Sequence, residues 1–178
     1  MPNHRAPAGF TLLELVIVVG TVSVLAAIAV PNLLRARVAS NEAAAIASLR
    51  TIGSAQLVFA SSCGAGGYAQ AFSDLAKGSA GSSEGFVGKD LGLDPSEKNG
   101  YRLTLEKEAA AGVTDVTAAG QSCNATIMPT VSSYWAGATP IGESGTREFA
   151  TDPRGAVFQS PVGTLIPNPI PAGATPIK

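Results

Sequence analysis

The sequence predicts an α+β protein: one long N-terminal helix whose outer half packs on a small antiparallel β-sheet. A run of 20 residues without a charge, Leu15 to Leu34, is followed by an Ala-rich segment without proline as far as Ser62. Past Gly100, apolar and polar side chains alternate in short segments. This alternation is the period of a half-buried strand. A helix first and strands later in the chain indicate an α+β architecture.

The composition excludes several kinds of chemistry. The chain of 178 residues has a net charge of −1, so it lacks the basic surface typical of nucleic-acid-binding proteins. It holds one histidine, His4, and two cysteines, which excludes a zinc site built from these residues and most histidine-dependent catalysis. No phosphate-binding GxxxxGK[ST] sequence is present, so the protein does not supply ATP hydrolysis itself. We expect a protein that is not an enzyme and has no cofactor.

The uncharged run is long enough to cross a membrane. At about 1.5 Å per residue it spans about 30 Å as a helix, the thickness of the hydrocarbon core of a bilayer. A membrane helix explains this length better than the buried helix of a soluble protein, and Pro31 near its end is expected to kink it. Arg5 precedes the run and Arg35 and Arg37 follow it, so the charges alone would place the N-terminus on the outer side of the membrane.

One carboxylate, that of Glu14, lies inside the apolar segment that begins at Phe10. A charged side chain in a bilayer costs on the order of 3 kcal/mol, so such residues usually have a partner and a function. No lysine or arginine follows at helical spacing before Arg35. Glu14 therefore needs a partner from another chain or must be neutral, unless its side chain reaches the edge of the membrane.

The residues from Gly9 to Val18 (GFTLLELVIV) and from Leu25 to Asn32 (LAAIAVPN) resemble the N-terminus of type IV pilins and pseudopilins. The resemblance covers about residues 9 to 60 and implies a pilin-like, lollipop-shaped fold. It also implies that a prepilin peptidase cleaves between Gly9 and Phe10 on the cytoplasmic side and methylates the new N-terminal amine of Phe10. Residues 1–9 would then be a cytoplasmic leader, an orientation opposite to the one that the charges favour.

The resemblance also implies a partner for Glu14. In the family, the glutamate of an incoming subunit pairs with the N-terminal amine of a neighbour, here that of Phe10. An α-amine has a pKa of about 8, so it is mostly cationic at neutral pH, and both charges are costly when unpaired in a medium of low dielectric constant. The implied partners are copies of the chain or related pilins, the prepilin peptidase, membrane lipid before assembly, and an inner-membrane assembly platform with a separate ATPase.

The long helix is expected in two halves, residues 10–34 in the membrane and the filament core and residues 35–62 outside. The Gly-rich segment 62–67 ends it. A short helix is expected at Phe72–Lys77, with Ser73 as its N-cap. Four apolar side chains recur on one face of the outer half, as in a helix that packs on a sheet: Ile46, Leu49, Ile52 and Phe59.

The head is expected to span residues 63–159, with three or four antiparallel strands packed on the outer half of the helix. The sequence Asp152-Pro153-Arg154-Gly155 is a turn signal and predicts a hairpin. The Pro-rich residues 160–178 are expected to form a loose, extended tail. The predicted strands are Tyr101–Lys107, Val113–Thr117, Ser133–Ala138, Arg147–Ala150 and Val157–Gln159.

Two groups of side chains in the head are candidate sites. Cys63 and Cys123 lie beyond the membrane segment, where an oxidising periplasm favours a disulfide over two free thiols. Asp90, Asp94 and Glu97 cluster in a Gly-containing loop and offer the oxygen ligands that Ca²⁺ prefers, although a solvated loop without metal is the stronger expectation.

Together these observations predict a structural subunit of a type IV pilus-like filament. It would be inserted in the bacterial inner membrane with its N-terminus in the cytoplasm and then added to a helical fibre at the cell surface. The nearest alternative is a pseudopilin of a type II protein secretion system in the periplasm, and a minor tip or adhesion subunit is another. A membrane-tethered enzyme is the weakest alternative, because no pair of acids stands out for hydrolysis.

Overall fold

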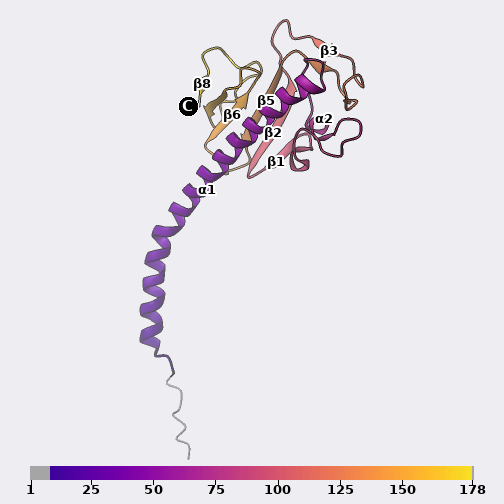
Figure 1. The fold of residues 1–178 in the computed structure, drawn as a ribbon. Helices are drawn as coiled ribbons and strands as arrows, with labels where there is room; N and C mark the ends of the chain where they lie inside the picture. The colour runs from indigo at the N-terminus through magenta and orange to yellow at the C-terminus, as the bar shows by residue number, and fades with distance from the viewer. Residues whose placement is uncertain (1–8, 178) are drawn as a thin grey trace, which may run out of the picture. The chain divides into compact units, whose positions relative to one another are not determined.

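The computed structural model describes residues 9–177 and contains the long helix and the antiparallel sheet that the sequence predicts (Figure 1). Helix α1 (Leu12–Ser62) begins two residues after the predicted start and ends at the predicted residue. The chain divides into two compact units between Arg37 and Val38, so α1 contributes to both.

The first unit is the N-terminal part of α1. Every side chain from Leu12 to Arg37 is exposed, and this helix is long and apolar enough to cross a membrane. The hydroxyls of Thr21 and Ser23 donate to the carbonyl oxygens of Val18 and Val19, so these polar groups are satisfied within the helix. Internal satisfaction of this kind is what an apolar surrounding requires. The helix continues through Pro31, and the kink there stays a prediction.

The second unit, from Val38 onward, is built on a six-stranded antiparallel sheet with the order β1-β2-β5-β6-β7-β8. A smaller two-stranded sheet pairs β3 with β4. The strands are β1 (Ser96–Lys98), β2 (Tyr101–Lys107), β3 (Asp115–Thr117), β4 (Thr130–Val131), β5 (Tyr134–Pro140), β6 (Arg147–Thr151), β7 (Val157–Pro161) and β8 (Thr175–Pro176).

The expectation of three or four strands was too low, because the short strands at the two edges of the sheet were not predicted. Strand β1 has three residues and β8 has two, and neither length shows a period of two. All five predicted strand segments are confirmed within a few residues, and β6 and β7 form the predicted hairpin around Asp152–Gly155. Edge strands this short leave few unpaired backbone groups exposed.

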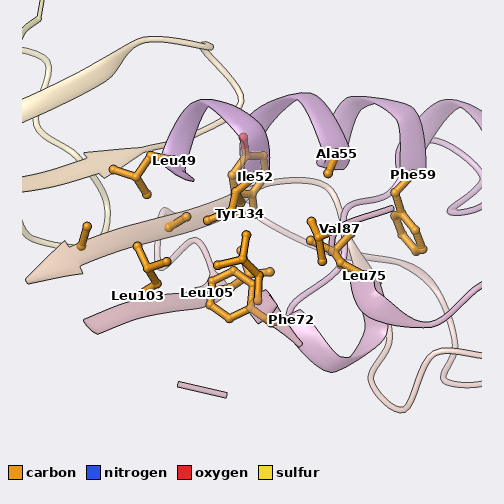
Figure 2. Close-up of a cluster of buried hydrophobic side chains, with 14 of the residues drawn as sticks. Leu49, Ile52, Ala55, Phe59, Phe72, Leu75, Val87, Leu103, Leu105 and Tyr134 are labelled. Carbon is orange, nitrogen blue, oxygen red and sulfur yellow. The ribbon is translucent and has the colours of Figure 1, made fainter. Parts of the chain in front are cut away.

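The outer half of α1 lies on one face of the sheet, where it makes the main hydrophobic core (Figures 1 and 2). The side chains of Leu49, Ile52 and Phe59 are fully buried, which confirms the predicted apolar face. They pack against side chains of the sheet, namely Leu103 and Leu105 of β2 and Tyr134 of β5. Ile46 of the predicted face packs at the edge of this core and is only partly buried.

The prediction that Ser73 caps the short helix was wrong. Helix α2 (Phe72–Ala76) begins at Phe72, which places Ser73 inside the first turn. The carboxylate of Asp94 takes the capping role instead, because it accepts hydrogen bonds from the backbone N–H groups of Phe72 (2.7 Å) and Ser73 (2.9 Å). A short 3₁₀ helix, η1 (Lys89–Leu91), follows in the same connection.

The C-terminal residues are packed on the head rather than loose along their length, which corrects the predicted tail. Ile166 and Ile170 are buried against Ala150 and Phe158, on the face of the sheet away from α1. Side chains of successive strand residues point to opposite faces, and Phe149 next to Ala150 indeed belongs to the main core. Strand β8 then pairs with β7. The five prolines of this segment coexist with two buried isoleucines that anchor it.

Candidate functional site

The first turn of α1 contains the residues that the sequence marks out. Gly9 and Phe10 precede the helix, and Phe10 is 78% exposed. The hydroxyl of Thr11 accepts a hydrogen bond from the backbone N–H of Glu14 (3.2 Å), which is the geometry of an N-cap. Gly9, Phe10 and Glu14 therefore lie within one short, accessible segment at the start of the helix. Residues 1–8 of the predicted leader, with His4 and Arg5, lie outside the described residues.

Glu14 has no ion-pair partner among residues 9–177. It stands in the first turn of α1, where the partial positive charge of the helix N-terminus favours a carboxylate. The side chains around it, Leu13, Leu15 and Val18, are apolar and exposed. The site is thus a single acid on an otherwise apolar, solvent-exposed helix surface.

A second polar site holds the outer half of α1 to the sheet. The buried carboxylate of Glu42 accepts hydrogen bonds from Nε and Nη2 of Arg147 (2.9 and 2.6 Å). It also accepts from the backbone N–H and the hydroxyl of Thr146, both at 2.8 Å. Nη1 of Arg147 donates to Gln159 on β7, so the guanidinium links α1 to two strands.

The electrostatics of this site follow from its contacts. Burial alone would raise the pKa of Glu42, but the hydrogen bonds from Arg147 and Thr146 outweigh burial and hold that pKa below its ordinary value of 4.5. The adjacent hydroxyl of Tyr101 donates to the carbonyl oxygen of Arg147 (2.9 Å). Burial raises the pKa of Tyr101 to about 12, so the hydroxyl keeps its proton at neutral pH. The charged pair is therefore stable near pH 7.

The sequence did not single out Glu42 and Arg147, because they are 105 residues apart and each is an ordinary polar residue in its own segment. The sequence did not single out Gln56 either. Its fully buried amide pairs with the backbone of Ala69, donating to the carbonyl oxygen (2.7 Å) and accepting from the N–H group (2.9 Å). A polar side chain between Ile52 and Phe59 on the apolar face was the one available signal.

The predicted disulfide is present. Cys63 at the end of α1 is bonded to Cys123, with 4.7 Å between the two Cα atoms and a sequence separation of 60 residues. The backbone N–H of Cys123 also donates to the carbonyl oxygen of Cys63 (3.1 Å). The bond ties the end of the long helix to the loop between β3 and β4.

The three acids considered for Ca²⁺ do not form a metal site. Asp90 is paired with Lys98, and that hydrogen bond holds the pKa of Asp90 below its ordinary value. Asp94 caps α2, and Glu97 is paired with Arg102 at 2.8 Å. Across residues 9–177, no group of three or more His, Cys, Asp or Glu side chains is placed to hold a metal ion.

Comparison of the chain with protein-family models, with curated proteins and with solved structures finds no match in any of the three.

Proposed function

We propose that this protein is a structural subunit of a type IV pilus-like filament. The observation that carries the proposal is the N-terminal part of α1. It presents 26 consecutive exposed residues, Leu12 to Arg37, with Glu14 as the one acid among them. An exposed apolar helix of this length needs lipid or other apolar helices around it. The remainder of α1 is anchored in a folded head.

Maturation supplies the partner that Glu14 lacks. Cleavage between Gly9 and Phe10 by a prepilin peptidase leaves a new amine on Phe10, which the same enzyme methylates. The segment that is cut lies before the helix begins, in an exposed stretch. The amine of one subunit then pairs with Glu14 of a neighbour, and a misplaced subunit keeps an unmatched carboxylate among apolar helices. The pair thus sets the register between copies.

The chain is first inserted in the bacterial inner membrane, with the short leader in the cytoplasm and the head in the periplasm. An assembly platform with its own ATPase extracts it into the filament, which exposes the heads at the surface. This proposal needs no cofactor and gives the protein no catalytic role. The disulfide between Cys63 and Cys123 suits an oxidising compartment outside the cytoplasm.

Replacing Glu14 with glutamine tests the proposal. Glu14→Gln should leave the protein processed and inserted in the membrane but should abolish filaments, because the neutral amide cannot pair with the amine. Glu84→Gln, which changes an exposed carboxylate of the head, is the matched control and should assemble normally. Normal filaments of the Glu14→Gln variant would overturn the proposed pairing. If deletion of this protein abolishes protein export and leaves surface fibres intact, the protein is a secretion pseudopilin instead. If each fibre contains only a few copies, it is a tip subunit.

A further inference from the structure

A groove of about 320 Å³ lies between α1 and the turn that joins β6 to β7. Leu49 and Leu57 of α1 form one apolar side, and Pro153 and Val157 form the other. Leu57 is 57% exposed. Its apolar surface is therefore left uncovered within a single copy of the head.

One stripe of α1 faces this groove. Arg50, Gly53, Ser54 and Leu57 are spaced by three and four residues, so they share a side of the helix, and all four line the groove. The side chain of Arg50 has no ion pair in the part of the chain that the structure describes. Gly53 leaves the hydroxyl oxygen of Tyr134 uncovered on this side, because a Cβ atom there would make an ordinary contact with it at 3.5 Å.

The floor of the groove carries a hydroxyl group without a partner. Tyr134 is 2% exposed and rises from the sheet toward α1 (Figure 2), and it lines the groove. None of the hydrogen bonds within residues 9–177 involves this hydroxyl, and it is not one of the fully buried polar atoms without a partner, which are Nε1 of Trp135 and Oε2 of Glu148. Burial raises the pKa of Tyr134, so the hydroxyl keeps its proton and is a donor for an incoming acceptor. The groove thus offers apolar walls, one cation and one hydroxyl donor.

A second surface of the same head has the complementary chemistry. Four exposed carboxylates in the head make no ion pair among the described residues: Glu84, Asp94, Glu106 and Glu143. Asp94, beside the exposed Leu93, already uses both of its oxygens to cap α2. Of the other three, only Glu143 lies within two residues of an exposed large apolar side chain. That side chain is Ile141, which is 38% exposed. Both residues belong to the turn between β5 and β6.

This turn is held in place by its own contacts. The backbone N–H of Ile141 donates to Gly100 (2.8 Å), and the hydroxyl of Ser144 donates to the carbonyl oxygen of Ile141 (2.7 Å). The amide of Asn41 on α1 donates to the carbonyl oxygen of Ser144 (3.1 Å). A turn that is fixed before association loses little conformational entropy on binding.

We propose that the groove receives the β5–β6 turn of a second copy of this chain, with Ile141 against Leu57 and Glu143 paired with Arg50. This inference rests on the proposed function and names a head-to-head contact of the filament. The two surfaces are different, so the contact is heterologous. Repeated contacts of this kind build an open fibre when the rotation between copies does not close a ring.

The positions of the two surfaces along α1 give the displacement between the copies. Asn41 marks the level of the turn, and the groove extends from Leu49 to Leu57. These levels differ by 49 − 41 = 8 to 57 − 41 = 16 residues. At about 1.5 Å per residue, copies in contact are displaced along the helix by about 12–24 Å.

Charge reversal tests the pair. Arg50→Glu and Glu143→Lys should each lower filament yield about tenfold, because like charges then face each other, and the double variant should recover most of the loss. Glu106→Lys, on the exposed side of β2, is the control and should assemble like the wild type. Normal yield of both single variants, or a double variant no better than the worse single variant, would overturn the inference. Wild-type chains that form no filaments would instead overturn the proposed function.

Disulfide trapping gives an independent readout at native charge. Leu57→Cys combined with Ile141→Cys should give a ladder of oligomers on oxidation of filaments, since a heterologous contact links each copy to two others. Leu57→Cys combined with Glu84→Cys is the matched control and should give no ladder. Cross-linked products no larger than dimers would indicate a symmetric contact. Intact filaments without cross-links would indicate that another segment or a small molecule occupies the groove. Either result overturns the inference.

Discussion

Replacement of Arg147 with methionine should destabilise the head by about 3 kcal/mol. Methionine keeps much of the apolar stem of the arginine, which lies beside the ring of Phe149, and removes the guanidinium. Glu42 is then left with its two contacts to Thr146 and no positive charge nearby. The change therefore tests how strongly this pair fixes α1 to the sheet.

The expected size follows from the exposure of the two partners. The Glu42 side chain is 6% exposed, whereas that of Arg147 is 43% exposed. Loss of one partner from a fully buried ion pair costs about 3–5 kcal/mol. Because solvent reaches Arg147, we expect the lower end of that range. Arg102→Met is the control, because it removes the partner of Glu97 from an exposed pair. The side chains of Arg102 and Glu97 are 52% and 54% exposed, and such surface pairs contribute about 1 kcal/mol or less.

Thermal unfolding of the full-length protein in detergent measures the difference. The fluorescence of Trp135, the only tryptophan of the chain, reports on the sheet. For a unit of this size, about 3 kcal/mol corresponds to a fall in Tm of about 10 °C. Arg102→Met should lower Tm by about 3 °C or less. Equal Tm values for the Arg147→Met variant and the wild type would refute the reasoning.

The pH dependence of the same unfolding transition provides a further check. The folded protein holds the pKa of Glu42 below its ordinary value of 4.5, so the unfolded chain binds this proton more tightly. The stabilisation is complete well above pH 4.5 and is lost as the pH falls through the folded pKa. The Glu42→Gln variant should be less stable at pH 7 and should lose less stability in acid. Parallel pH curves for the two proteins would contradict this assignment.

Two further predictions concern the fold. Reduction of the Cys63–Cys123 bond should lower the free energy of unfolding by about 4 kcal/mol on the chain-entropy model for a loop of this length, as measured by denaturant titration with and without reductant; unchanged stability would show that the bond adds nothing. Gly53→Ala should raise stability by about 0.5–1 kcal/mol, because the new methyl group makes an ordinary contact with Tyr134 and alanine favours a helix; a lower Tm would show that the groove needs the glycine for folding.

The sequence predicted the elements that carry a long periodic signal. Helix α1 and strand β2 match their predicted ranges within two residues. A long uninterrupted helical segment predicts α1, and a regular alternation of apolar and polar side chains predicts β2. The β1–β2 hairpin was missed although its signal is present. Asn99 and Gly100 have φ angles of 50° and 75°, which suit a tight two-residue turn, and Asn-Gly is a strong hairpin dipeptide.

Contacts between distant segments could not be predicted from the sequence. Asp94 was expected in a solvated loop, with Ca²⁺ binding as the weaker candidate, but it caps a helix whose first residue lies 22 positions earlier. No local pattern singled out Glu42, and its burial becomes favourable only through the contacts with Thr146 and Arg147. Such pairings depend on the tertiary fold, because each residue alone is compatible with solvent exposure.

The intact mass and N-terminal sequence of the native protein test the central claim most directly. A filament subunit that enters the fibre through cleavage and amine pairing must begin at an N-methylated Phe10. Purified native material should therefore lack residues 1–9 and carry one extra methyl group. A chain that still begins with Met1, or one that begins at an unmodified Phe10 in assembled fibres, would contradict the account.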